Sequence, residues 1–208
     1  MPRQTALLHP VRRLCTRCAG HGAAWARRLL CLLLVLLGLG QHPGAQSGER
    51  NTALAAQVAS AYVYKFASFV DWPDDAFTQP DSPLAIGVMG ADTLADVMSA
   101  NLAGRQSNGR KLIVKKLRPG DSLAGIHMLY LGTLPRLELI GIYASLKERP
   151  VLTITESAEA FTLGSMINFV LAGERLRFEI ALQSVAPSRL KVSALMLAAA
   201  VRVTKGGS

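Results

Sequence analysis

The order of short apolar segments after residue 83 constrains the fold more than any other feature of the chain. Four segments have the length and apolar content of strands: residues 84–89, 111–117, 126–131 and 151–155. Two stretches with helical spacing of apolar residues, 92–102 and 134–147, are interleaved with them. Strands that alternate with helices predict a largely parallel sheet, because parallel neighbours need a crossover connection between them.

The C-terminal part of the chain changes pattern. Residues 165–171 and 175–182 are strand candidates separated by Ala-Gly-Glu, which predicts a hairpin. In the second strand Arg175, Arg177 and Glu179 alternate with apolar residues, so one face is expected in solvent and the other in the core. Together the segments predict an α/β fold. It is a single three-layer domain whose mixed, mostly parallel sheet ends in an antiparallel hairpin and carries helices on both faces.

Helices are also expected at both ends of this domain. Asn51 is the predicted cap of a helix over residues 52–70, and Pro73 disfavours its continuation. Apolar residues recur along this helix at helical spacing and are expected to face the core: Leu54, Val58, Ala61, Tyr62, Phe66 and Phe69. Ser193 is the predicted cap of a last helix that runs through Val203.

The N-terminal segment reads as an export signal. Residues 29–40 carry no charge, follow a basic stretch, and precede small residues that suit a signal peptidase. The run is too short for a bilayer span, which needs about 20 apolar residues. We therefore predict a signal peptide over residues 1–45 and one domain over 46–208, with Ala45 or Gly40 as the cleavage point. An uncleaved anchor is the alternative, and it also leaves the domain outside the cytoplasm.

Charge and cysteine content separate this leader from the rest of the chain. The net charge of +9 includes six arginines in residues 1–46; the remaining 17 basic and 14 acidic residues give a net of only +3. No nucleic-acid partner is therefore expected. Cys15, Cys18 and Cys31 all lie in the leader, so the exported domain has no thiol for a disulfide, for catalysis or for a metal.

The remaining sequence offers few groups for catalysis. His127 is the single histidine of the exported domain, no Gly-x-Ser-x-Gly turn accompanies it, and we expect a strand histidine whose hydrogen bonds are satisfied. Residues 104–111 resemble a phosphate loop only in spacing, because Arg-Lys replaces Lys-Ser/Thr and a strand follows. The turn after residue 89 lacks the third glycine of a dinucleotide fingerprint, and Asp92 is expected to cap the next helix.

Acidic residues are grouped in two places. Asp71, Asp74 and Asp75 lack the glycine and distal glutamate of a calcium loop, so a solvated loop is expected. Glu156 and Glu159 flank a polar turn and are not expected to face each other across a substrate. We therefore predict no catalytic residue, no metal site and no cofactor. An exported hydrolase is the least favoured alternative.

Some side chains are better suited to contact another protein. Five are candidate partner contacts: Trp72, Lys111, Lys115, Arg175 and Arg177. Tryptophan is enriched at interface hot spots, although Trp72 fits a plug at the end of the first helix equally well. The two lysines belong to a basic strand that also includes Lys116 and Arg118. That strand fits a charged edge that prevents unwanted pairing, or alternatively a surface for an acidic partner.

The order of these segments resembles the YfiR-like family of periplasmic proteins. The matching stretches cover nearly the whole exported domain: residues 61–73 (AYVYKFASFVDWP), 83–90 (PLAIGVMG), 151–156 (VLTITE), 164–170 (GSMINFV), 175–180 (RLRFEI) and 190–193 (LKVS). The resemblance implies an exported, non-enzymatic protein that binds the periplasmic sensor domain of a membrane diguanylate cyclase. Such binding represses the cyclase and keeps cyclic-di-GMP signalling and biofilm formation low.

The exported domain differs from that family in two respects. Ala181 stands where the family often has Asn, and the exported domain lacks the disulfide cysteines of the best-understood member. Redox control through such cysteines is therefore not expected here. A periplasmic small-ligand binding protein remains the alternative function, since an open α/β sheet offers a crevice at its strand ends. A homodimer through the hairpin edge is a further candidate.

Overall fold

A computed structural model describes residues 44–205, with side chains from residue 52 onward. The predicted export signal up to residue 43 lies outside the described residues, as do the three cysteines. Within the chain, Glu49–Ser208 cluster as one compact unit. None of the described helices combines the length and apolar character needed to cross a bilayer.

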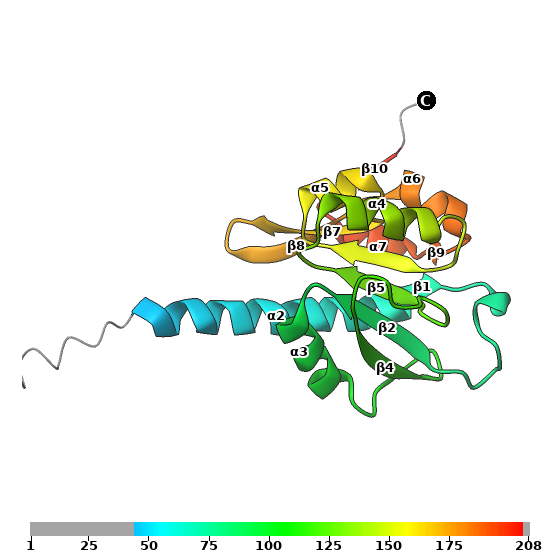
Figure 1. The fold of residues 1–208 in the computed structure, drawn as a ribbon, viewed down its shortest axis with the longest axis horizontal. Helices are drawn as coiled ribbons and strands as arrows, with labels where there is room; N and C mark the ends of the chain where they lie inside the picture. The colour runs from blue at the N-terminus through cyan, green and yellow to red at the C-terminus, as the bar shows by residue number, and fades with distance from the viewer. Residues whose placement is uncertain (1–43, 206–208) are drawn as a thin grey trace, which may run out of the picture. The chain divides into compact units, whose positions relative to one another are not determined.

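Eight strands of the described chain form one sheet (Figure 1). In spatial order they are β10 (Arg202–Thr204), β8 (Arg175–Ala181), β7 (Ile167–Ala172), β6 (Leu152–Thr155), β5 (Met128–Leu131), β2 (Leu84–Met89), β4 (Arg110–Leu117) and β3 (Gln106–Ser107). The five strands from β4 to β7 run parallel, while β8 is antiparallel to β7 and β3 to β4. The mixed, mostly parallel sheet with a hairpin is therefore confirmed.

Helices cover both faces of this sheet, which confirms the three layers. One face carries α2 (Gly44–Phe69), α3 (Asp92–Leu102), α6 (Leu182–Val185) and α7 (Ala194–Ala199). The other carries α4 (Arg136–Ser145) and α5 (Ala158–Leu163) (Figure 1). Two short elements, β1 (Val70–Asp71) and β9 (Lys191–Val192), pair separately beside the end of α2. The 3₁₀ turns Asp74–Ala76 and Ala186–Ser188 complete the described elements.

Strand β2 shows why the sheet is central to the core. All six of its residues are buried, as expected for a parallel strand with helices on both sides. Ile86 and Val88 pack into the cluster under α2, whereas Ala85 and Met89 pack under α4. The period-two alternation of a strand thus divides the core into two layers.

An aromatic cluster fixes α2 on its face of the sheet. The Phe66 ring meets Phe178 of β8 edge-on at 4.9 Å and stacks on Phe169 of β7 at 5.9 Å, centroid to centroid. The Tyr62 ring adds an edge contact to Phe178 at 5.5 Å, and its hydroxyl donates to the carbonyl of Leu176 at 3.2 Å. These contacts join residues more than 100 positions apart.

The start of α2 differs from the prediction. The helix begins at Gly44, so Asn51 lies inside it and is not its cap. A cap preference is a weak local signal, and the stretch between Gly44 and Asn51 contains no proline to prevent helix formation.

The cap of α3 also differs by one position, because Ala91 is its N-cap and Asp92 its first residue. The Asp92 carboxylate still lies in the first turn, where negative charge is favourable.

The last helix is shorter than predicted. Ser193 does cap it, since its Oγ accepts the amide hydrogen of Met196 at 3.3 Å, but α7 ends at Ala199. The chain then becomes extended and forms β10 along the outer edge of β8, with the amide of Val201 donating to the carbonyl of Phe178 at 2.9 Å. The β-branched residues of the sequence Val-Arg-Val-Thr favour a strand there.

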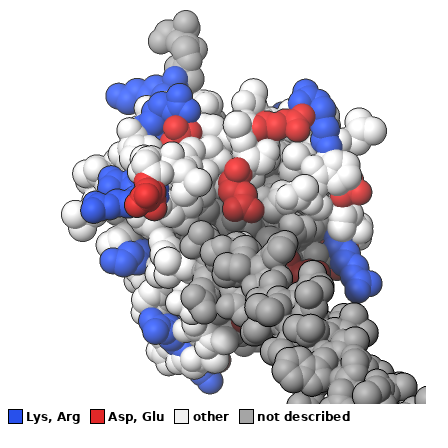
Figure 2. Space-filling view, turned by 90° about the vertical axis from the view of Figure 1, so that its left-hand side faces the viewer, with Lys and Arg blue, Asp and Glu red and all other residues white. Residues whose placement is uncertain are grey.

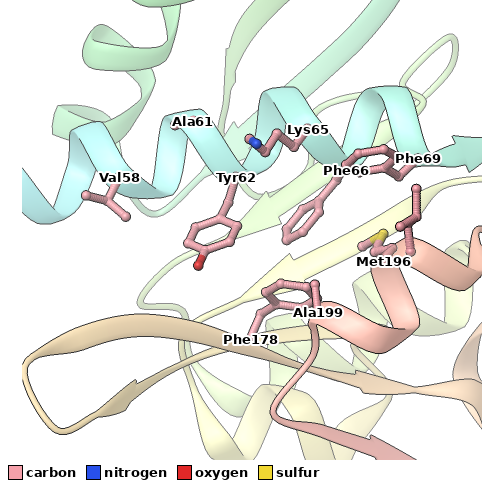
Figure 3. Close-up of a pocket in the computed structure, with 10 residues that line it drawn as sticks. Val58, Ala61, Tyr62, Lys65, Phe66, Phe69, Phe178, Met196 and Ala199 are labelled. Atoms are coloured by element: carbon pink, nitrogen blue, oxygen red, sulfur yellow. The ribbon is translucent and has the colours of Figure 1, made fainter.

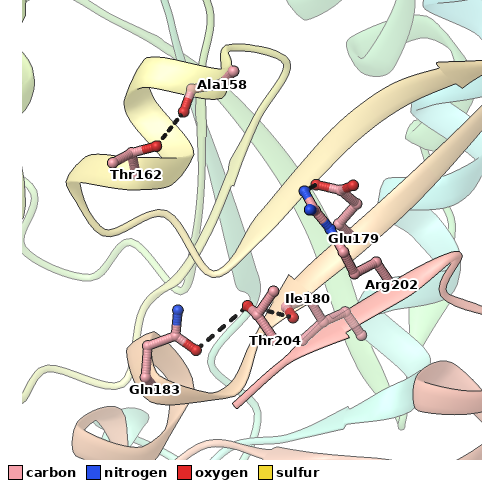
Figure 4. Close-up of polar contacts among 7 residues, drawn as sticks. All are labelled: Ala158, Thr162, Glu179, Ile180, Gln183, Arg202 and Thr204. Carbon is pink, nitrogen blue, oxygen red and sulfur yellow. Dashed lines mark hydrogen bonds and ion pairs between the residues drawn. The ribbon is translucent and has the colours of Figure 1, made fainter. Parts of the chain in front are cut away.

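Side chains hold β10 against its neighbours (Figure 4). Arg202 donates to the Glu179 carboxylate at 2.8 Å, and Thr204 Oγ1 lies 3.3 Å from the carbonyl oxygen of Ile180. Thr204 Oγ1 also lies 3.4 Å from the side-chain oxygen of Gln183. As a result, Glu179 is only 8% exposed, and its predicted place on a solvent-facing side of β8 is wrong. The strand β10 covers Glu179, and the pattern that predicts the β7–β8 hairpin does not indicate this third strand.

Candidate functional site

A groove of about 390 Å³ lies between α2 and α7, and we call it the α2–α7 groove. Tyr62 and Phe66 of α2 point toward Phe178 of β8, which lies at its base, while Met196 and Ala199 of α7 line the opposite side (Figure 3). Its lining is almost entirely apolar: Val58, Ala61, Tyr62, Lys65, Phe66, Phe69, Phe178, Leu195, Met196 and Ala199. The groove exists because α7, at six residues, is too short to cover the whole length of α2.

Exposed apolar side chains extend the surface of this groove. Leu195 of α7 is 70% exposed, and Leu54 and Val58, one turn apart on α2, are 62% and 36% exposed. Val201, just after α7, is exposed as well. An apolar groove with exposed apolar residues on the same elements marks an interaction site more often than a free surface.

The predicted apolar stripe of α2 is therefore only partly a core stripe. Phe66 is buried, but Leu54, Val58 and Ala61 are exposed. The core-facing residues of the helix follow a stripe shifted around the axis: Ala59, Val63, Phe66, Ala67 and Val70 at its end. The sequence does contain a signal for the groove: apolar residues occupy more of the circumference of α2 than the sheet can cover.

Lys65 is the one charged residue among those that line the groove. It is exposed, and no carboxylate of the described residues lies within ion-pair distance of it. Among the described residues that line the groove there is no Asp, Glu, His, Ser or Cys, and its ionisable side chains are the Lys65 amine and the Tyr62 hydroxyl. The groove is suited to binding an apolar group that has a negative charge nearby.

The five predicted partner contacts lie on different elements, and none of them lines the groove. Lys111 and Lys115 are exposed on β4, whereas Arg175 and Arg177 lie on β8. Four strands separate β4 from β8 in the sheet, which places the two pairs about 24 Å apart at the usual strand spacing. This strand order cannot be predicted from the sequence alone.

Trp72 lies at the end of α2 and is half-buried. Its indole N–H donates to the backbone carbonyl of His127 at 3.2 Å, and its ring packs against the core cluster under α2. These contacts support the interpretation of Trp72 as a plug that closes the helix end.

His127 has the satisfied environment expected of it. Its Nδ1 accepts the amide hydrogen of Ala85 at 3.1 Å, so Nε2 carries the proton and donates to the carbonyl of Ala76 at 3.1 Å. Phe77 stacks on the imidazole at 4.4 Å, and the Arg110 guanidinium lies 3.6 Å from the Phe77 ring centroid on the ring face. Burial lowers the pKa of His127, the Ala76 hydrogen bond raises it, and the positive charges of Arg110 and Lys115 lower it further.

The basic strand fits the charged-edge interpretation. Only the first two residues of β4 pair with β3, so most of its outer edge has no strand neighbour. Lys116 forms an ion pair with Asp96 at 2.7 Å. The face drawn in Figure 2 carries both basic and acidic side chains among its described residues.

The other motifs also have structural partners. Asn108 and Gly109 adopt positive φ at the two-residue turn between β3 and β4, the geometry of an Asn-Gly hairpin. Asp75 pairs with Arg189 at 2.9 Å. Glu159 pairs with Arg136 at 2.7 Å, whereas the charge of Glu156 acts on Tyr130, so the two glutamates have different environments.

Backbone hydrogen bonds join two loops at the strand ends, where the crevice of the small-ligand alternative is expected. The parallel strand order reverses between β2 and β5, where ligands of such folds usually bind. Here the amides of Gly132 and Thr133 donate to the carbonyls of Met89 and Gly90 at 2.9 and 3.1 Å, which joins the two loops. A hollow of about 370 Å³ beside them, between α2 and the ends of β2 and β6, remains for the small-ligand alternative.

Comparison with known proteins identifies a family. The model of the family described as YfiR/HmsC-like (DUF4154) matches residues 56–201, most of the described chain. Among solved structures, the chain is similar to that of a conserved domain protein from Vibrio cholerae O1 biovar El Tor, with 10% sequence identity and a TM-score of 0.44. That match covers 58% of this chain and 54% of the Vibrio chain, and it is too distant to carry an inference.

Proposed function

This chain belongs to the YfiR/HmsC-like family, a periplasmic family of regulators of cyclic-di-GMP signalling, and from that premise we propose its specific role. The exported domain binds the periplasmic sensor domain of a membrane diguanylate cyclase and represses it. It acts as a binding protein and not as an enzyme. Lower cyclase output then keeps the cyclic-di-GMP level and biofilm formation low.

Repression follows from differential affinity. If the domain binds the inactive state of the sensor more tightly than the active state, occupancy shifts the cyclase toward the inactive state. A hundredfold difference in affinity is worth about 2.7 kcal/mol of such bias. The domain needs a specific contact surface for this, and it needs no reactive group.

The observation that supports a binding role is the α2–α7 groove. Its exposed apolar rim, including Val58 and Leu195, is costly to leave in water, and a protein partner would cover it. Aromatic and methionine side chains, such as Tyr62 and Met196 here, are the residue types enriched at interface cores.

Deletion of the gene tests this function. We expect the cellular cyclic-di-GMP level to rise in the deletion strain and to return when the chain is supplied with its own leader. A chain without residues 1–45 should not restore the level, because it would stay in the cytoplasm. An unchanged level under several envelope stresses would refute the repressor role.

A further inference from the structure

We propose that the α2–α7 groove receives a large apolar side chain of the cyclase sensor domain, next to an acidic residue whose carboxylate pairs with Lys65. This inference rests on the proposed function and deepens it by stating the chemistry of the contact. It assigns the partner contact to the groove between α2 and α7, whose base is Phe178 of β8, and not to the basic side chains of β4 and β8.

The shape and lining of the groove account for the apolar half of the contact. Side chains from three separate elements converge on it, Phe66 from α2, Phe178 from β8 and Met196 from α7. All three are buried, so the base of the groove is preformed by the core. An anchor that enters this groove exchanges part of its water shell for contact with apolar side chains, and well-packed pockets of this kind are the setting of interface hot spots. The flexible side chain of Met196 can adjust its conformation to the group that binds.

Lys65 accounts for the charged half. It follows Ala61 by one helical turn on the same side of α2, and both residues line the groove. Its ammonium group has no acidic neighbour among the described residues, so it is available to a carboxylate from outside. A partner with an apolar residue beside Asp or Glu satisfies both halves at once. Charge complementarity of this kind sets the specificity and the association rate of a complex.

The same lysine disfavours a second copy of the chain as the occupant. A two-fold symmetric contact applies the same patch to both subunits. Centred on the groove, it would bring Lys65 toward the Lys65 of the other copy, without an acidic residue among the lining residues to separate the charges. Like charges brought together across an interface cost binding energy.

A lipid surface is also a poorer occupant than a protein. Membrane-surface binding combines apolar insertion with several basic residues that face anionic headgroups. The residues that line this groove supply one cation, and its apolar base is concave. A recessed pocket fits a protruding side chain better than it fits a flat bilayer.

Binding titrations of matched variants test the inference. The full chain is exported with its own leader, purified from the periplasm, and titrated with the extracytoplasmic domains of the host's membrane diguanylate cyclases. Three variants change the groove: Lys65→Glu reverses its charge, Ala199→Trp fills it, and Leu195→Asp alters its exposed rim. Lys111→Glu, a charge reversal on β4, is the matched control. Thermal unfolding of each variant confirms that it is folded.

We expect Lys65→Glu to raise Kd about tenfold and Ala199→Trp about a hundredfold. Leu195→Asp, at a largely exposed position, should fold and still weaken binding. Lys111→Glu should stay within about twofold of the unchanged chain. An acidic-to-lysine change in the sensor domain should restore the affinity of Lys65→Glu while it weakens the unchanged chain.

Other results of these titrations would contradict either the groove assignment or the proposed function. If the unchanged chain binds a sensor domain and the groove variants bind it equally well, the groove assignment is wrong and the proposed function stands. If it binds none at about 100 µM, the proposed function fails and the inference with it. If the groove variants instead abolish self-association, the occupant is a second copy. If they abolish binding to vesicles with anionic lipid, the occupant is a membrane. Either of these last results overturns the proposal.

Discussion

The two faces of the sheet are built from different residues and are covered to different degrees. Under α2 and α7 the core is aromatic, with Phe66, Phe169 and Phe178 in contact, and it is left open at the groove. Under α4 and α5 the core is aliphatic, with Leu129 and Leu139 among its buried members. A long helix beside a six-residue one leaves an open apolar groove, and a binding surface can arise there without a separate domain.

This difference suggests a division of work between the faces. In the proposed division, the α4–α5 face stabilises the fold, and the α2–α7 face combines that role with partner binding. If the division holds, equal damage to the two cores should have unequal effects on binding.

The largest effect is expected from truncation of buried side chains on the two faces. Phe66→Ala should lower the free energy of unfolding by about 3–5 kcal/mol and Leu139→Ala by about 2–5 kcal/mol, because each leaves a cavity in a close-packed core. Urea denaturation measures both. Of the two, only Phe66→Ala should abolish binding of the sensor domain under conditions where both variants are folded.

Equal loss of binding in the Phe66 and Leu139 variants would mean that the faces are not divided in this way. Leu137→Ala is the control on α4, since Leu137 is 81% exposed. Its effect on stability should stay within about 0.5 kcal/mol.

A smaller effect is expected from a pair of glycines. A Cβ on Gly132 would overlap the backbone oxygen of Gly90, so Gly132→Ala should destabilise by about 1–3 kcal/mol. Gly141 lies within α4 with nothing near its would-be Cβ, and Gly141→Ala should stabilise by about 0.5–1 kcal/mol. Thermal or urea unfolding measures both changes. If α4 is structural only, the more stable Gly141 variant should bind the sensor domain as the unchanged chain does.

His127 predicts a dependence of stability on pH. Burial in the folded protein holds the pKa of His127 below its ordinary value of 6.5, so the unfolded chain takes up the proton more readily. Stability is therefore full above pH 6.5 and falls as the pH falls toward the folded pKa. Protonation of Nδ1 would set two donors, Nδ1 and the Ala85 amide, against each other.

Urea unfolding at pH 7.5 and pH 5 measures this dependence. His127→Asn, whose side chain does not titrate, should remove the part of the decrease that lies just below pH 6.5. Carboxylates account for losses at lower pH, and they remain in the variant. An unchanged decrease in the Asn variant would show that the imidazole is not its source.

The smallest effect on stability is expected at the open edge of β4. Replacement of Lys115, which lies beyond the part of β4 that pairs with β3, by Val should change the unfolding midpoint little, because its side chain is exposed. The variant should nevertheless self-associate more, since charged side chains protect an unpaired strand edge. Light scattering against concentration measures this. A variant that stays monomeric would show that Lys115 does not protect the edge.

Elements with a strong local pattern could be predicted from the sequence. The strand Leu84–Met89 and the helix Asp92–Leu102 have the predicted bounds, because each is a short periodic segment between clear turn signals. The Ser193 cap was likewise local and is confirmed. The hairpin of β7 and β8 followed from its alternation and turn residues.

Features that depend on distant contacts could not be predicted. β10 forms because the outer edge of β8 is free beside it; the β-branched residues of Val-Arg-Val-Thr favour a strand there, but the alanine-rich stretch before Val201 favours helix. The α2–α7 groove depends on the length of α7 and on where β8 presents Phe178. Residue type alone indicates Lys115 and Arg177 as candidate contacts. The distance between them depends on the order of the strands in the sheet, which the sequence does not show.

Hydrogen–deuterium exchange of the chain, free and in complex with the sensor domain, is the most direct test of the division between the two faces. We expect slower exchange in the complex over residues 54–69 of α2 and 194–201 around α7, with no change over Arg136–Ser145 of α4. Slower exchange over α4, or over the β4 edge, with none around the groove would contradict the assignment of partner binding to the α2–α7 face.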